Sequence, residues 1–165
     1  VIKDDAMLNA RGVKGHKQPL RVVLDPFLDL SPSSRFAQIA PHSPALVFHC
    51  SANTQKEARL HALGIQTSLV PGVADEIDLN RIMSELQLRN ISSIFLETGN
   101  RLSEAFWRAR LVDKCVIFYG NMIIGGARSC LHGLDLLSIA NAIPLEQITV
   151  AKYGQNIMLT GYPVY

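Results

Sequence analysis

Short apolar runs alternate with helix-spaced stretches along most of this chain. Runs this short and this rich in β-branched and aromatic residues are typical of buried strands. There are five of them: LRVVLD (20–25), ALVFHC (45–50), IQTSLV (65–70), SSIFLE (92–97) and KCVIFYG (114–120). Strands that alternate with helices favour a mainly parallel sheet. The pattern therefore predicts an α/β fold.

The segments between these runs have the spacing of amphipathic helices. The three longest are residues 53–63, 78–90 and 99–110. Gly64 provides a left-handed stop after the first, and Asp78 is a good N-cap for the second. The third places apolar residues from Leu102 to Ala109 on one face. A further short helix is expected around residues 34–39.

The C-terminal region has a different pattern. QITVAKYGQNIMLTGYP (147–163) consists of two strand-like runs around Tyr153–Asn156, where Gly154 tolerates a positive φ. This arrangement predicts an antiparallel hairpin. The expected architecture is a mainly parallel sheet flanked by helices, with a C-terminal antiparallel hairpin, in a single domain over residues 1–165.

Length and charge exclude several classes of protein. With 165 residues, 48% of them hydrophobic, the chain can bury a substantial core. The net charge is +2 and no long basic block occurs, which argues against nucleic-acid binding. No apolar stretch approaches the roughly 18 residues that a membrane helix needs, and no signal peptide is recognisable. We expect a soluble, cytoplasmic protein without a membrane partner.

Motifs for metal and nucleophilic catalysis are missing. The three cysteines are far apart without a CxxC pair, and the five histidines form no HExxH or other ligand spacing. There is also no GxSxG nucleophile elbow, no GxGxxG fingerprint and no GxxxxGK[ST] phosphate loop. We therefore expect no metal site in these residues and no covalent protein nucleophile.

The stretch ETGN (97–100) holds the most informative local chemistry. If a strand ends at Glu97 and a helix begins at Gly99, both residues lie at the carboxyl end of the sheet, where open α/β folds bind ligands. The helix start favours an anion such as a cofactor phosphate, while the carboxylate of Glu97 suits substrate hydroxyl or N–H groups. The alternative is a solvated strand end followed by an ordinary turn glycine.

Three longer stretches carry a resemblance to a known family. They are VIKDDAMLNAR (1–11), QPLRVVLD (18–25) and IFLETGNRLSEAFWRARLVDKCVIFYGNMIIGG (94–126). In order and spacing they resemble the reductase domain of the bacterial riboflavin biosynthesis protein RibD. The resemblance implies a dihydrofolate-reductase-like fold, a homodimer, and NADPH-dependent reduction of 5-amino-6-(5-phosphoribosylamino)uracil to its ribitylamino product by hydride transfer to ribose C1′.

The resemblance also assigns site residues. Asp4 would contact the cofactor, Leu8 and Arg11 would line the substrate site, and Arg11 suits the substrate phosphate because a guanidinium binds phosphate in a fork. Glu97 would bind substrate and could assist a proton transfer. The cofactor loop and helix start would be Gly99, Asn100, Arg101, Leu102, Ser103, Glu104 and Ala105.

Two features depart from the family pattern, and two other functions stay open. After Glu-x-Gly the family often has proline or another small residue, whereas this chain has Asn100 and Arg101, whose charge could serve a cofactor phosphate or face water. Pro26 follows VVLD where the family usually has a small hydroxyl residue that touches the cofactor. The domain's first strand and helix are expected upstream of Val1, and a zinc-dependent deaminase domain could precede them. The alternatives are another dihydrofolate-reductase-like NADPH oxidoreductase and a non-catalytic dimerisation module that uses KCVIFYG and the hairpin as its interface.

Overall fold

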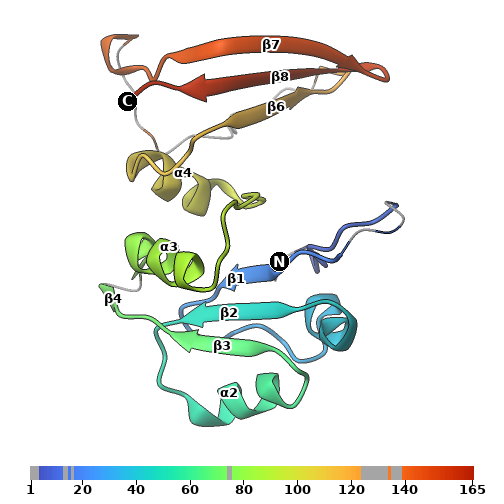
Figure 1. The fold of residues 1–165 in the computed structure, drawn as a ribbon, viewed down its shortest axis with the longest axis vertical. Coiled ribbons are helices and arrows are strands. Elements are labelled where there is room, and N and C mark those ends of the chain that lie inside the picture. The colour runs from blue at the N-terminus through green and yellow to red at the C-terminus, as the bar shows by residue number, and fades with distance from the viewer. Residues whose placement is uncertain (1–3, 13–14, 16, 74–75, 124–133, 135–138) are drawn as a thin grey trace. The chain divides into compact units, whose positions relative to one another are not determined.

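The computed structural model describes residues 4–12, 15, 17–73, 76–123, 134 and 139–165. The chain divides into two compact units, Val1–Ser92 and Ser93–Tyr165. The elements of the first unit are β1 (Arg21–Leu24), α1 (Arg35–Gln38), η1 (Ala40–His42), β2 (Ala45–His49), α2 (Thr54–His61), β3 (Gln66–Leu69), β4 (Gly72–Val73), β5 (Glu76–Ile77) and α3 (Leu79–Leu88) (Figure 1). Those of the second are α4 (Asn100–Arg108), β6 (Cys115–Tyr119), η3 (Ile139–Asn141), β7 (Leu145–Tyr153) and β8 (Asn156–Pro163).

A three-stranded parallel sheet in the order β1-β2-β3 organises the first unit. Every residue of the central strand β2 is buried. Successive side chains of a strand point to opposite faces, so Val47 joins one core cluster and Leu46 the other. The predicted parallel arrangement of these three strands is confirmed.

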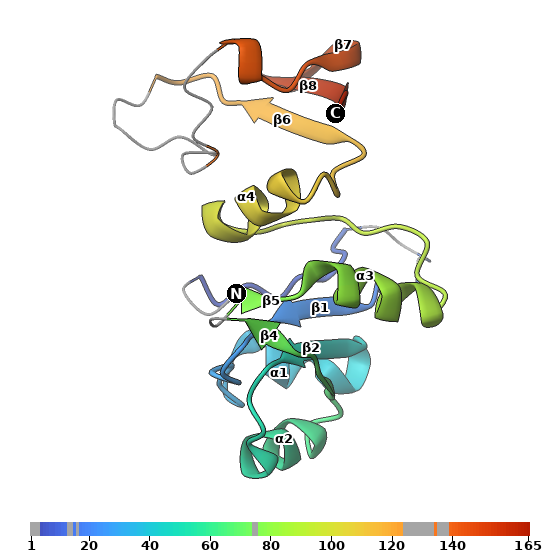
Figure 2. The same cartoon turned by 90° about the vertical axis from the view of Figure 1, so that its left-hand side faces the viewer.

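Helices cover both faces of this sheet (Figure 2). One cluster contains Phe36 of α1 and Leu60 of α2, and the other contains Ile82 and Leu86 of α3. Burial of such side chains contributes roughly 1.5–3 kcal/mol each, and it requires the apolar stripe that the helical spacing predicted.

Local signals set the helix ends as the sequence indicated. The Asp78 side chain accepts hydrogen bonds from the N–H groups of Asn80 and Arg81, at 2.9 and 3.2 Å. Gly64 adopts φ +79° just beyond α2, where a side chain would be strained. The sequence did not reveal the two-residue strands β4 and β5, which pair antiparallel.

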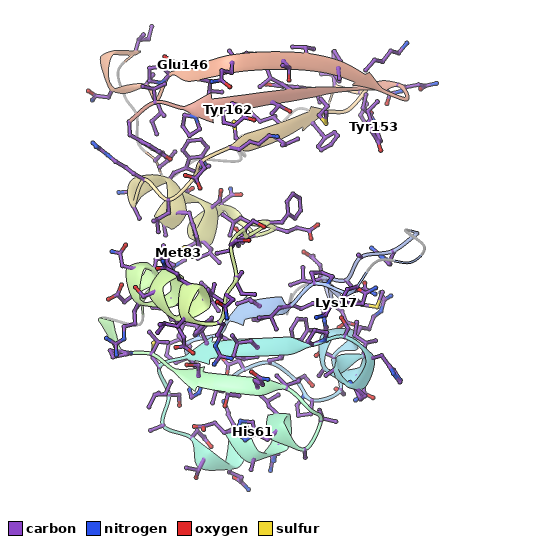
Figure 3. All side chains as sticks on the ribbon, in the orientation of Figure 1. Lys17, His61, Met83, Glu146, Tyr153 and Tyr162 are labelled. Carbon is purple, nitrogen blue, oxygen red and sulfur yellow. The ribbon has the colours of Figure 1, made fainter. Side chains whose placement is uncertain are left out.

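An antiparallel sheet in the order β6-β8-β7 forms most of the second unit. The predicted hairpin is confirmed: β7 and β8 pair from Tyr153 and Asn156 outward, with Gly154 at φ +63°. The strand expected at 114–120 is also present, as β6, and it pairs antiparallel with β8. The ring of Phe118 packs edge to face against that of Tyr153, with the ring centroids 6.2 Å apart. Figure 3 labels Tyr153 on this sheet.

The strand predicted at 92–97 is wrong. Residues 91–99 belong to no helix or strand, and Phe95 is 85% exposed. The apolar composition of this segment indicated burial, but a strand also needs a neighbour for its backbone hydrogen bonds. Glu97 therefore lies in an irregular segment before α4 and not at the end of a strand.

Candidate functional site

The first group of candidate residues lies on an irregular segment ahead of β1. Asp4 and Arg11 are exposed, and the half-buried Leu8 packs against the core cluster that covers one face of the parallel sheet. Asp5 and Leu8 adopt positive φ values of 44° and 54°. Such values are strained for a bulky residue and persist only when the surroundings hold the backbone in place.

A buried arginine supplies much of this support. Arg21, at the head of β1, is only 2% exposed. Its guanidinium donates hydrogen bonds to the backbone carbonyls of Met7, Phe36 and Ser43, at 3.1, 2.8 and 2.6 Å. Burial lowers the pKa of Arg21 from its usual value, although a guanidinium remains charged at neutral pH. Arg21 thus ties the candidate segment to β1, α1 and the turn before β2.

Two further contacts hold the same segment. A carboxylate oxygen of Asp5 accepts the N–H of Arg35, the first residue of α1, at 2.8 Å. The side-chain amide of Gln18 both accepts from Ala10 N–H and donates to Ala10 C=O, each at 3.1 Å. Asp5 and Ala10, which lie on either side of Leu8, are therefore tied to residues thirty and eight positions away in sequence.

The second group precedes and opens α4. Glu97 and Gly99 are exposed, and the hydroxyl of Thr98 donates to the carbonyl of Gly99 at 2.9 Å. Gly99 is the N-cap of α4, and its C=O accepts the N–H of Ser103 at 3.1 Å. Of the remaining candidates, Asn100 and Arg101 are exposed, and four are half-buried, namely Leu102, Ser103, Glu104 and Ala105.

The folded chain itself does not require glycine at position 99. Gly99 has φ −78°, which any residue adopts, and a Cβ atom added there would meet no atom within 4 Å. The open space lies at a helix N-terminus, whose dipole favours negative charge. These features fit a phosphate group that approaches the backbone closely.

The two groups fall in different units. Asp4, Leu8 and Arg11 belong to the first unit, and Glu97 to Ala105 belong to the second. Gly125 and Gly126, which contributed to the family resemblance, lie outside the described residues. Pro26 is half-buried, and its carbonyl accepts the N–H of Cys50 at 3.0 Å.

Sequence reasoning missed the residues that support the candidate segment, namely Asp5, Gln18 and Arg21. A charged residue at the head of the apolar run LRVVLD was the available signal for Arg21, since a charge there is either solvated or paired. No local pattern identifies Gln18 or Asp5, because their partners are eight and thirty residues away.

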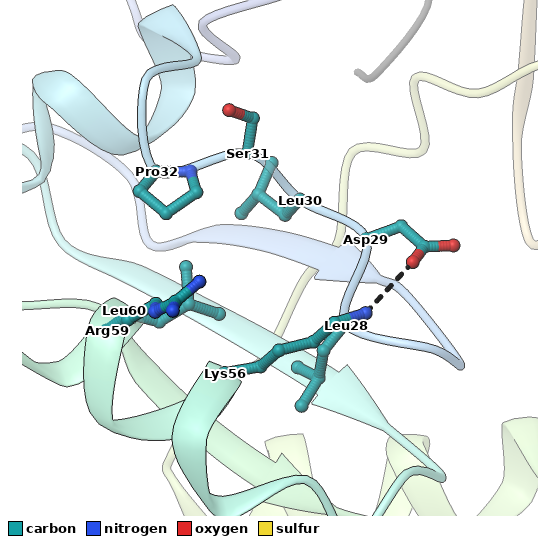
Figure 4. A pocket seen from close by; sticks show the side chains of 8 residues that line it. All are labelled: Leu28, Asp29, Leu30, Ser31, Pro32, Lys56, Arg59 and Leu60. Atoms are coloured by element: carbon teal, nitrogen blue, oxygen red, sulfur yellow. Dashed lines mark hydrogen bonds and ion pairs between the residues drawn. The ribbon is translucent and has the colours of Figure 1, made fainter.

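A pocket of about 180 Å³ lies between the loop after β1 and α2 (Figure 4). Three of its polar side chains, those of Asp29, Ser31 and Lys56, have partners within the protein. The Lys56 ammonium pairs with Asp29 at 3.1 Å and donates to the Phe27 carbonyl at 3.0 Å, while the Ser31 and Ser33 hydroxyls lie 2.7 Å apart. The Asp29 carboxylate opposes a phosphate group, so we assign no cofactor contact to this pocket.

The residues that the structure describes contain no group of three or more His, Cys, Asp or Glu side chains placed to hold a metal ion. None of their helices has the length and apolarity to span a bilayer.

Comparison with known proteins identifies the family. Residues 1–159 match the family described as the RibD C-terminal domain, so this chain belongs to that family. The Riboflavin biosynthesis protein RibD of Aquifex aeolicus is 28% identical over 159 residues, which are 96% of this chain and 43% of that protein.

Two solved structures share the fold. RibD of Acinetobacter baumannii superposes with a TM-score of 0.79 at 20% identity, covering 99% of this chain and 44% of that one. Yeast riboflavin biosynthesis reductase Rib7 gives 0.73 at 16% identity, covering 99% and 70%. The predicted fold class is confirmed by these likenesses. The chain spans less than half the length of the RibD proteins it matches.

Proposed function

We propose that this chain is the reductase domain of a riboflavin biosynthesis enzyme. In this proposal it reduces 5-amino-6-(5-phosphoribosylamino)uracil to the ribitylamino product with NADPH. Membership of the RibD C-terminal domain family is the observation that carries it. The yeast relative, named as a riboflavin biosynthesis reductase, supports the same reaction class.

The start of α4 is the proposed contact with the cofactor. Open space at Gly99 and the positive end of the helix dipole support binding of a cofactor phosphate there. Residues Asn100 to Ala105 continue this contact along the first turns. For Asp4, in the first unit, we propose a cofactor contact on the family resemblance alone. When bound, NADPH supplies the hydride that reduces C1′ of the ring-opened imine, and it departs as NADP⁺.

Glu97, Leu8 and Arg11 form the proposed substrate contacts. The exposed carboxylate of Glu97 accepts hydrogen bonds from substrate hydroxyl or N–H groups, and Arg11 binds the phosphate. Leu8 lines the site, where its anchored and strained backbone provides a rigid wall. Reduction also adds a proton to the imine nitrogen, and in this proposal Glu97 assists that transfer.

Isotope transfer tests the proposed reaction directly. The full-length protein is incubated with the phosphoribosylamino-pyrimidine and NADPH in which both hydrogens at nicotinamide C4 are replaced by deuterium, and the product is analysed by mass spectrometry. One deuterium at C1′ is expected, and Glu97→Gln should form product much more slowly. Unlabelled product would exclude direct hydride transfer. NADPH binding without turnover would favour a related oxidoreductase with another substrate.

We further propose a cytoplasmic homodimer. Apolar side chains on one face of the antiparallel sheet support assembly, since Phe118 is 59% exposed in one chain and Tyr153, whose ring contacts it, is 67% exposed. Sedimentation analysis of the full-length protein and of Phe118→Glu tests this, with the variant expected to be monomeric. An unchanged dimer in the variant would place the interface elsewhere.

A further inference from the structure

The side chain of Gln18 forms the same hydrogen bonds to the backbone of Ala10 that a neighbouring strand would form. Its Oε1 accepts the Ala10 N–H and its Nε2 donates to the Ala10 C=O, both at 3.1 Å. An amide that satisfies both backbone groups of one residue reproduces a hydrogen-bonded pair of an antiparallel ladder. We call this pair of bonds the Gln18 clip.

Both sides of the Gln18 clip are anchored to the core of the first unit. Gln18 lies three residues before Arg21, which is buried and begins β1. Leu8, two residues before Ala10, packs on the core cluster beside α1 and α2. The clip therefore connects two fixed points and does not merely join two free segments.

Arg11 directly follows the clipped residue. Its side chain is exposed and has no hydrogen-bond or ion-pair partner among the residues that the structure describes. When an arginine side chain has no partner, the region that its guanidinium can reach depends mainly on the position and direction of its own backbone. Since the clip fixes the backbone at Ala10, it also restricts where the guanidinium of Arg11 can reach.

We propose that Gln18 is a positioning residue that aims Arg11 at the phosphate of the substrate. This inference rests on the proposed function, in which Arg11 binds that phosphate. Preorganisation reduces the conformational freedom lost on binding, so the clip strengthens substrate binding without touching the substrate.

Four variants of the full-length protein test this: Gln18→Ala, Gln18→Glu, Arg11→Ala and the double variant Arg11→Ala/Gln18→Ala. Gln87→Ala, an exposed glutamine on α3, is the matched control. For each we measure kcat, the KM values for the phosphorylated pyrimidine and for NADPH, and deuterium exchange at the Ala10 amide without ligand.

Gln18→Ala should raise the KM for the phosphorylated pyrimidine roughly fivefold, as expected for loss of about one net hydrogen bond, with kcat and the KM for NADPH nearly unchanged. Exchange at Ala10 should accelerate. Gln18→Glu keeps the acceptor for Ala10 N–H and should recover part of the loss. In the Arg11→Ala background, Gln18→Ala should have little further effect.

Three outcomes would overturn the inference: unchanged exchange at Ala10, faster exchange with an unchanged KM, or a full additional effect of Gln18→Ala in the Arg11→Ala background. Normal KM values in Arg11→Ala would show that Arg11 does not bind the substrate. The positioning role proposed for Gln18 would then be wrong, although the exchange data could still show that the Gln18 clip exists.

Discussion

Arg21 and Phe36 make two contacts with each other inside the first unit. The guanidinium of Arg21 donates to the Phe36 carbonyl at 2.8 Å and stacks on the Phe36 ring, 4.2 Å from its centroid. The planar guanidinium satisfies carbonyls at its edge while its face covers the aromatic ring. This arrangement joins β1 to α1, and through Met7 it reaches the segment that carries Leu8 and Arg11.

Arg21 should therefore be important for stability. Arg21→Lys keeps the charge, but an ammonium cannot serve three carbonyls and stack at once. We expect the free energy of unfolding to fall by about 3 kcal/mol, because buried carbonyls lose their donors. Urea denaturation measures this, with Arg81→Lys on the exposed side of α3 as the control. Equal loss in both variants would contradict the role given to the Arg21 contacts.

Asp78 should stabilise α3 through its cap. Asp78→Ala removes the acceptor for the N–H groups of Asn80 and Arg81, and we expect a loss of about 1 kcal/mol in thermal or urea unfolding. Asp78→Ser, which retains a capping oxygen, should recover most of that loss. Identical stability of the two variants would show that the cap contributes little.

Tyr165 should ionise at higher pH than an unperturbed tyrosine. Partial burial raises the pKa of Tyr165 above its ordinary value, and the nearby charge of Asp113 acts in the same direction while that of Arg110 opposes it. Its hydroxyl donates to the carbonyl of Val112 at 3.1 Å, a bond that needs the protonated phenol. The protonated phenol therefore stabilises the folded protein. This contribution is fully present below the pKa of Tyr165 in the unfolded state, and it is lost as the pH rises through the higher pKa in the folded state.

Ultraviolet titration of tyrosinate absorbance checks this expectation in the native protein. Tyr165→Phe should remove a component that ionises above the ordinary tyrosine range, and it should weaken the dependence of stability on alkaline pH. If Tyr165→Phe instead removes a tyrosinate component with the ordinary tyrosine pKa, the pKa of Tyr165 is not raised in the folded protein.

Gly99→Ser separates the helix cap from the cofactor contact. Serine is a better N-cap than glycine, and a Cβ atom fits the open space, so stability should be unchanged or slightly higher. Under the proposed function the same side chain obstructs the cofactor phosphate, and we expect the Kd for NADPH to rise roughly tenfold or more. Normal NADPH affinity in a stable variant would remove Gly99 from the cofactor site.

Periodicity predicted the strands whose signals lie within a few adjacent residues. The buried strand around Val47 is a continuous apolar run, and the hairpin at Gly154 has two strand-like runs around a turn glycine. The segment 92–97 has an equally apolar sequence, yet it has no strand as a neighbour in the described structure, and composition cannot reveal that.

The family resemblance identified most of the candidate site residues, and the local sequence pattern identified fewer of them. The amide-rich helix start at Gly99 followed from residues adjacent in sequence. The left-handed backbone at Leu8 did not, because long-range contacts from Arg21 and Gln18 hold its segment in place. Contacts across such distances have no periodic signature.

Binding of NADPH to the full-length protein tests the central claim most directly. Calorimetric titration is made with and without the phosphoribosylamino-pyrimidine, and absorbance of the reduced nicotinamide is then followed over time. We predict saturable binding of NADPH and loss of the absorbance only when the pyrimidine is present. A well-folded protein that binds no NADPH under either condition would contradict the assignment as a reductase.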